Sequence, residues 1–202
     1  MRLFLLIAAT LALHGASAAA QDEHGRRLAA TLAIMQGDAR QLLAADLAPV
    51  HREGLRARLA GDLSSLPMLL RRHGADGRAA APLRERLAHA DWAGLERALA
   101  ELRRRFPLAP DILAVPPAPA LARQGKAIHR ETCSGCHDNR LGADTALPAH
   151  DLFEMARRQP RDEFAARLIA SVRGDITTAY DNPFSEQQLA ALLLHYQGAA
   201  AP

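Results

Sequence analysis

Apolar residues recur at intervals of three and four along most of this chain, which is the spacing of one face of an α-helix. The strict alternation of a half-buried strand is nearly absent. Three such stripes precede residue 107 and predict three long helical segments. Their members are Leu28, Leu32, Met35, Ala39 and Leu42, then Leu55, Leu59, Leu63, Leu66 and Leu70, then Trp92, Leu95, Leu99, Leu102 and Phe106.

Turn-forming residues separate these stripes at 46–49, 74–77 and 89–91. Asp91 is the predicted N-cap of the last helix, and Pro67 is expected to kink or interrupt the middle one. Because the connections are short, residues 21–106 are predicted to form an antiparallel helical bundle. We interpret its methionines and histidines as core and solvated side chains rather than ligands, because they lack a shared helical pairing. They are Met35, Met68, His24, His51, His73 and His89.

A cluster of five prolines between residues 107 and 119 predicts a linker, since each ring fixes φ and removes a hydrogen-bond donor. Beyond it the pattern predicts helices over 120–132, 151–158 and 162–173, and a last one after Ser185. Ser185 and Gln188 have the spacing of a capping box. The sequence therefore predicts an all-α protein, in which an amino-terminal bundle is followed by a small helical domain over 120–202.

The segment Cys133-Ser134-Gly135-Cys136-His137 carries the candidate chemistry and contains the only two cysteines of the chain. Cys-x-x-Cys-His is the attachment signature of c-type haem. Two thiols three positions apart can each add to one haem vinyl group, and the following histidine can bind the iron. A thioredoxin-type dithiol would require a βαβ setting, and a zinc site would require two more soft ligands. We predict one covalent haem c on Cys133 and Cys136, with its iron on His137.

The first 20 residues predict export. Arg2 precedes an apolar run over 3–13, and small residues at 16–18 and 18–20 offer cleavage near Ala18 or Ala20. The run is shorter than the roughly 20 residues that cross a bilayer, and no later stretch approaches that length. We expect a cleaved signal peptide, with an uncleaved anchor as the alternative, and a periplasmic protein without a transmembrane segment.

Composition changes this interpretation little. The formal net charge of +3 over 202 residues is too small to indicate a nucleic-acid partner. Lys126 is the only lysine, and the excess of arginine and alanine is typical of a compositional bias of the genome rather than of a basic surface.

Residues from about 118 to 202 resemble a class I cytochrome c domain. The resemblance consists of Gly125 ahead of the Cys-x-x-Cys-His segment, Leu147-Pro148 after it, and a closing helix that ends in Leu193 and Tyr196. It implies that Gly125 packs against Tyr196 where the first and last helices cross. It also implies that the carbonyl of Pro148 accepts the Nδ1 hydrogen of His137.

By this resemblance we expect an electron carrier rather than an enzyme, with no catalytic residue. Its partners would be redox proteins, a membrane-bound complex among the candidates.

The chain departs from this family at the distal ligand of the iron. The stretch 175–182, where the family has a methionine, contains none. Met155, His150, His195 and Tyr180 are the remaining candidates, although Met155 is better interpreted as a core side chain. An open distal position would instead indicate a sensor or enzyme that binds a gas or peroxide.

Overall fold

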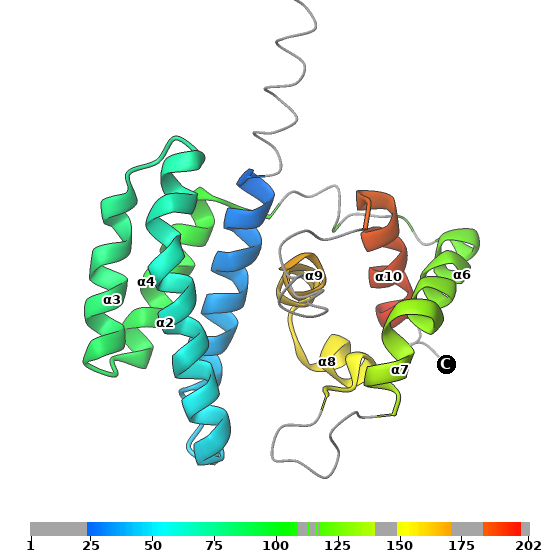
Figure 1. Ribbon diagram of the computed structural model, residues 1–202, viewed down its shortest axis with the longest axis horizontal. Helices are drawn as coiled ribbons and strands as arrows, with labels where there is room; N and C mark the ends of the chain where they lie inside the picture. The colour runs from blue at the N-terminus through cyan, green and yellow to red at the C-terminus, as the bar shows by residue number, and fades with distance from the viewer. Residues whose placement is uncertain are drawn as a thin grey trace, which may run out of the picture.

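The computed structural model describes residues 24–108, 113, 116, 118–139, 149–170 and 184–198. Every regular element in these ranges is a helix, so the all-α prediction is confirmed (Figure 1). Among the helices described, none is long and apolar enough to cross a membrane. The predicted signal peptide, residues 1–20, lies outside the described ranges.

Four helices and one 3₁₀ turn form the amino-terminal part. They are a first helix over 24–41, drawn in blue in Figure 1, then α2 (Pro49–Arg72), the turn η1 (Gly77–Ala80), α3 (Ala81–Ala88) and α4 (Trp92–Arg105). The breaks between these helices fall at or next to the turn-forming positions 46–49, 74–77 and 89–91 that the sequence predicts. Asp91 caps α4, because its carboxylate accepts a hydrogen bond from the backbone N–H of Gly94 at 2.9 Å. The three predicted stripes meet in one hydrophobic core.

Of the two outcomes expected at Pro67, a kink or an interruption, the interruption is wrong, because α2 is continuous from Pro49 to Arg72. A proline cannot donate to the carbonyl four residues earlier, which here is that of Leu63. Arg84 of α3 donates to this carbonyl instead, from Nε at 3.2 Å and from a terminal nitrogen at 2.9 Å. The neighbouring helix therefore supplies the hydrogen bond that the proline removes.

The carboxyl-terminal part is also helical. Its elements are α6 (Pro119–Ile128), the π-helical turn η2 (His129–Cys133), α7 (Ser134–His137), α8 (Leu152–Arg158), α9 (Arg161–Ala170) and α10 (Glu186–Gly198). The capping box before α10 is confirmed, since Ser185 N–H donates to Gln188 Oε1 at 2.8 Å and Gln188 N–H donates to Ser185 Oγ at 3.3 Å. Helices α6 and α10 pack along each other (Figure 1).

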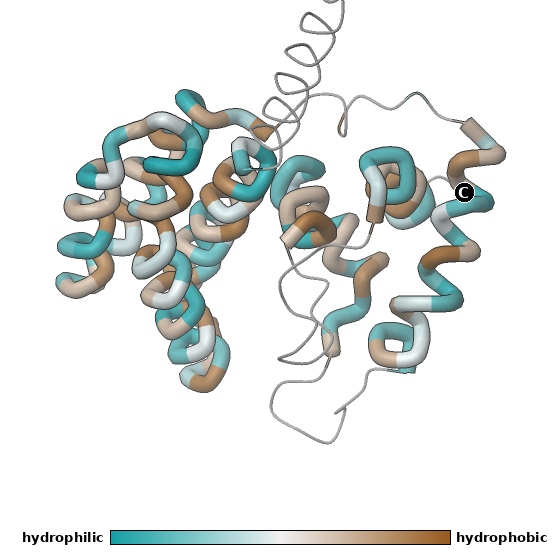
Figure 2. The backbone as a smooth tube through the Cα atoms, turned by 45° about the horizontal axis from the view of Figure 1, so that its top comes forward, coloured by the Kyte–Doolittle hydropathy of each residue, from teal (hydrophilic) through white to brown (hydrophobic). Residues whose placement is uncertain are grey.

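The helix over 24–41 belongs to two hydrophobic cores. Leu28, Leu32 and Met35 are buried in the core with α2, α3 and α4. A second face of the same helix is buried with side chains of α8, α9 and α10; it consists of Ala29, Ala30, Ala33 and Ile34. In Figure 2, hydrophobic and polar positions alternate along the helices on both sides of it. One helix therefore joins the amino-terminal and carboxyl-terminal parts.

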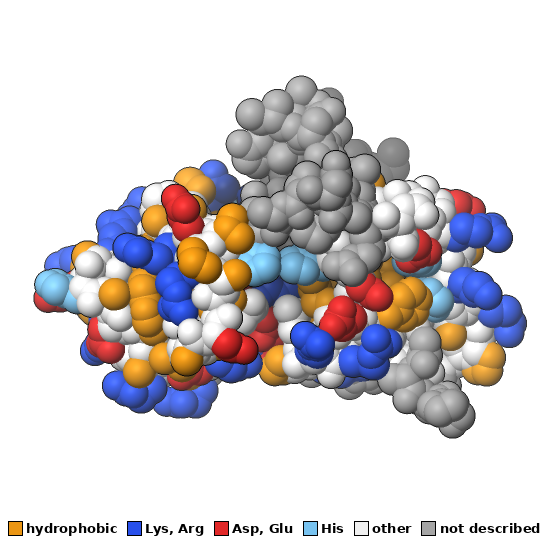
Figure 3. Space-filling model, turned by 90° about the horizontal axis from the view of Figure 1, so that it is seen from below, with side chains coloured by type: hydrophobic (Ala, Val, Ile, Leu, Met, Phe, Trp, Pro, Cys, Tyr) orange, Lys and Arg blue, Asp and Glu red, His pale blue; other side chains and the backbone are white. Residues whose placement is uncertain are grey.

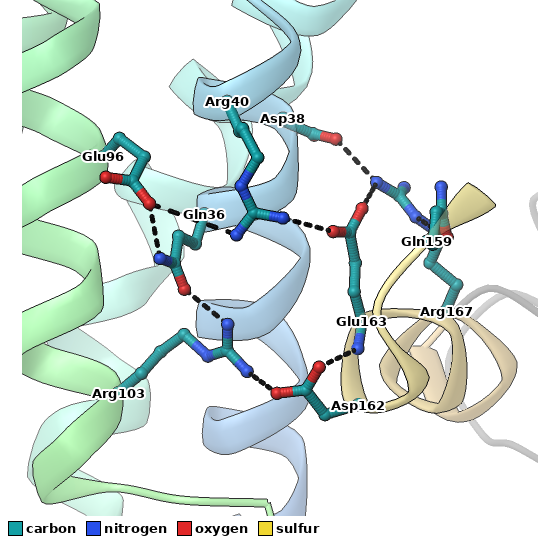
Figure 4. Close-up of polar contacts among 9 residues, drawn as sticks. All are labelled: Gln36, Asp38, Arg40, Glu96, Arg103, Gln159, Asp162, Glu163 and Arg167. Carbon is teal, nitrogen blue, oxygen red and sulfur yellow. Dashed lines mark hydrogen bonds and ion pairs between the residues drawn. The ribbon is translucent and has the colours of Figure 1, made fainter.

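A buried charge network lies along the same boundary (Figure 4). The side chain of Asp38 is 0% exposed. Its carboxylate accepts two hydrogen bonds from Arg58 of α2, at 2.5 and 2.7 Å, and one from Arg167 of α9 at 3.0 Å. Arg167 also donates to Glu163 at 3.0 Å and to Gln159 at 3.2 Å. A buried carboxylate thus binds one arginine from each part of the chain.

A second set of polar contacts extends this network toward α4. Gln36 donates to Glu96 at 2.6 Å and accepts from Arg103, which also pairs with Asp162 of α9.

On the face drawn in Figure 3, basic side chains are spread widely and interspersed with acidic ones.

The predicted linker over 107–119 remains a prediction, since much of it lies outside the described ranges. The parts on either side of it share a helix, a core and buried ion pairs. We therefore do not expect them to behave as independent domains.

A substitution in the carboxyl-terminal part tests whether the two parts unfold together. Arg167→Met removes a charged hydrogen bond from Asp38, and we expect the free energy of unfolding to fall by about 2–3 kcal/mol. The fluorescence of Trp92, the only tryptophan, reports on α4 in the other part of the chain. We expect its unfolding transition to shift to lower denaturant concentration.

The matched control is Arg158→Met, which removes an exposed arginine that pairs with Glu154 on α8. Exposed pairs of this kind contribute about 0–1 kcal/mol. An unchanged Trp92 transition in Arg167→Met would mean that the two parts unfold separately.

Candidate haem attachment site

The Cys-x-x-Cys-His segment completes a continuous helical stretch formed by α6, η2 and α7 (Figure 1). Cys133 is the last residue of η2, while Cys136 and His137 lie on α7. Both thiols are free; that of Cys133 is partly buried and that of Cys136 is exposed. The hydroxyls of Thr132 and Ser134 each donate to a carbonyl four residues earlier, at 2.7 and 2.8 Å. Side chains thus support the irregular turn that carries the first cysteine.

His137 is held by one strong backbone contact. Its Nδ1 lies 2.6 Å from the carbonyl oxygen of His150. A carbonyl can only accept, so Nδ1 carries a hydrogen, and in the neutral ring Nε2 is then the nitrogen with the lone pair. This is the state in which an imidazole binds a metal, and a carbonyl on the other nitrogen is the usual outer partner of such a ligand. With two thiols beside it, His137 fits the attachment of a haem.

The carbonyl that holds His137 is that of His150, 2.6 Å from Nδ1. Pro148, the partner that the resemblance implied, lies outside the described residues, so that partner stays a prediction. The expected kind of contact, a backbone carbonyl on Nδ1, is present.

Helices α6 and α10 cross at Gly125. A methyl group at this position would lie 2.1 Å from the carbonyl oxygen of Ala191 and 2.8 Å from Cβ of His195. Only glycine allows this approach. The nearest contacts of Gly125 are with Ala191 and His195, so the expected crossing of the first and last helices is present, while its packing against Tyr196 stays a prediction. The ring of Tyr196 packs against the rings of Phe153 and Phe164.

The structure describes three of the four candidates for the distal ligand. The backbone carbonyl of His150 accepts the Nδ1 hydrogen of His137, so this residue already contacts the candidate iron ligand. Met155 is partly buried against the second core, in agreement with its interpretation as a core side chain. Burial, followed by the nearby His129 and Lys126, lowers the pKa of His195, whose ring packs against Phe153. Tyr180 and the stretch 175–182 lie outside the described residues.

Sequence analysis missed His129 and Asp138, which flank the motif. The ring nitrogens of His129 contact Tyr196 Oη at 2.8 Å and Asp138 Oδ2 at 3.1 Å. The sequence signal for His129 was a polar residue on the buried face of the predicted helix, four residues before the first cysteine. In the ranges that the structure describes, the attachment segment included, no group of three His, Cys, Asp or Glu side chains is placed to hold a metal ion.

No model of a protein family, no curated protein and no solved structure matches this chain. The interpretation of the site depends on the motif and on its surroundings in the fold.

The crossing at Gly125 can be tested against a second glycine of the same segment. We expect Gly125→Ala to destabilise the protein by about 2 kcal/mol or more, since the new methyl group would meet backbone rather than a flexible side chain. Chemical denaturation followed by circular dichroism measures the effect.

Gly135→Ala is the control, because a methyl group at Gly135 meets no atom within 4 Å. Equal stability of the two variants would show that α6 and α10 do not cross closely at Gly125.

Proposed function

We propose that this protein is a periplasmic c-type cytochrome that transfers single electrons through one covalently attached haem. The observation that carries the proposal is the state of His137 next to Cys133 and Cys136. Its Nδ1 hydrogen is bound by the His150 carbonyl, which leaves Nε2 as a ligand immediately after two free thiols. The haem, when bound, supplies the one-electron chemistry of iron.

The chain's own residues have distinct roles in this proposal. Cys133 and Cys136 hold the cofactor by thioether bonds, and His137 binds the iron. The carbonyl of His150 fixes the orientation of the His137 ring and increases its basicity, which favours ferric iron. The buried ring of Tyr196 belongs to the second hydrophobic core, and its hydroxyl contacts His129 just ahead of the attachment segment.

A second candidate function, binding of a gas or peroxide at an open distal position, is favoured by one observation. Met155, the only methionine after the motif, packs against the second core. If no other side chain binds the distal face, a small molecule can reach the iron.

The proposed cofactor has a direct test by mass. We expect protein made together with a haem-attachment system to gain the mass of one haem that survives extraction with acidic acetone. The variant with Cys133→Ala and Cys136→Ala should lose it, because both thioether positions are gone. His137→Ala should keep the added mass but lose the native absorption spectrum. An unmodified mass in the wild-type protein would refute the proposal.

The distal ligand is tested at Met155. If Met155 is a core side chain, Met155→Ala should leave the absorption spectrum and reduction potential nearly unchanged, and lower stability by about 2–5 kcal/mol. Met155→Leu, which conserves volume, should cost less than about 1.5 kcal/mol. A large fall in reduction potential in both variants would identify Met155 as the distal ligand. Rapid binding of carbon monoxide by the wild-type protein would favour the open site.

A further inference from the structure

The ring of His129 is a buried polar group beside the attachment motif. The residue is 6% exposed and lies at the start of the π-helical turn η2. Its ring is in edge-on contact with Phe153 and Tyr196, with centroids 5.4 Å apart in each case. His195 lies at a similar distance, 5.5 Å. The imidazole is therefore surrounded by rings and has little freedom to rotate.

Both nitrogens of this ring have partners. Tyr196 Oη lies 2.8 Å from Nδ1, and the Asp138 carboxylate lies 3.1 Å from Nε2. Burial, more than its neighbours, raises the pKa of Tyr196, so the phenol keeps its proton. Because a carboxylate only accepts, Nε2 carries the hydrogen that it donates to Asp138, while Nδ1 shares a hydrogen bond with the Tyr196 hydroxyl. Both polar atoms of the buried ring are therefore satisfied.

This chain of hydrogen bonds joins three elements. Tyr196 belongs to α10, His129 to η2, and Asp138 is the C-cap of α7. Asp138 is also the residue that directly follows His137. An apolar ring at position 129 would fill the same space without the cost of burying polar atoms. What a histidine adds at this position is therefore a pair of hydrogen bonds that connect Tyr196 of α10 to Asp138 at the end of α7.

We propose that His129 is a positioning residue of the haem site. By holding Asp138 against α10, it fixes the carboxyl end of α7 and thereby the orientation of the His137 ring on the iron. This inference rests on the proposed function. The carbonyl of His150 restrains the same ring from its Nδ1 side, so His137 is held at its backbone and at its ring.

The orientation of an axial imidazole affects the ferric spectrum and the reduction potential, and both can be measured on the holoprotein. His129→Phe keeps a ring in the buried site but removes both hydrogen bonds. Asp138→Ala removes only the outer partner, whose side chain is half exposed, so the fold should survive this change. We expect each variant to broaden the ferric electron paramagnetic resonance lines. Each should also shift the equilibrium between ferric and ferrous protein by about three- to tenfold.

Because the two residues act through one chain of hydrogen bonds, the double variant should shift this equilibrium no further than either single one. Asp138→Asn retains an oxygen that accepts from Nε2 and should restore narrow lines. Glu131→Ala, which removes an exposed carboxylate from η2 that makes no contact with His129, is the control for lost charge.

The outcomes separate this inference from the proposed function. Wild-type protein without covalent haem would refute the proposed function and this inference with it. Haem attached in every variant, with potentials and line widths equal to those of the wild type, would refute the role of His129 alone. If His129→Phe does not fold, Asp138→Ala decides, and a wild-type spectrum in that variant overturns the inference.

Discussion

The arrangement of the two parts of this protein depends on the carboxylate of Asp38, which is completely buried between Arg58 and Arg167. A buried charge is costly unless its partners are placed with good geometry, so the two arginines must approach from fixed directions. One comes from α2 and the other from α9. The hydrophobic burial of Ala33 and Ile34 against the carboxyl-terminal helices is non-directional, whereas the ion pairs require particular directions of approach. The charge network therefore determines how the two parts dock.

The segment that follows from this docking is close in the chain to the candidate haem site. Arg167 lies on α9, α9 follows α8 after a brief connection, and His150 lies just before α8. The carbonyl of His150 holds the Nδ1 hydrogen of His137. The segment that orients the proposed proximal ligand thus belongs to the part of the chain that the amino-terminal helices fix in place. Burial and the charges of Arg167 and Arg58 lower the pKa of His150, which agrees with its position near the boundary.

The sequence could predict the elements whose cause is local. The spacing of leucines determines the amino-terminal helices, and the caps at Asp91 and Ser185 need only residues three positions away. Features caused by distant residues could not be predicted. Helix α2 continues past Pro67, where Arg84 supplies the missing hydrogen bond, and the carbonyl that binds His137 comes from His150, 13 positions along the chain. The second buried face of the first helix did have a signal, since apolar residues surround that helix on more than one side.

The contacts around His137 bear on the choice between an electron carrier and a sensor. A sensor that signals through its proximal ligand needs that ligand to move when a small molecule binds on the opposite face. Here the His137 ring is hydrogen-bonded to the carbonyl of His150. Asp138, the next residue, is connected by hydrogen bonds through His129 to the buried Tyr196. Constraints at both the ring and the backbone resist such movement. In the proposed cytochrome they would also keep the ligand in one position in both oxidation states, which would lower the reorganisation that electron transfer requires. The proximal side therefore favours the carrier, and a role in binding small molecules would have to depend on the distal side alone.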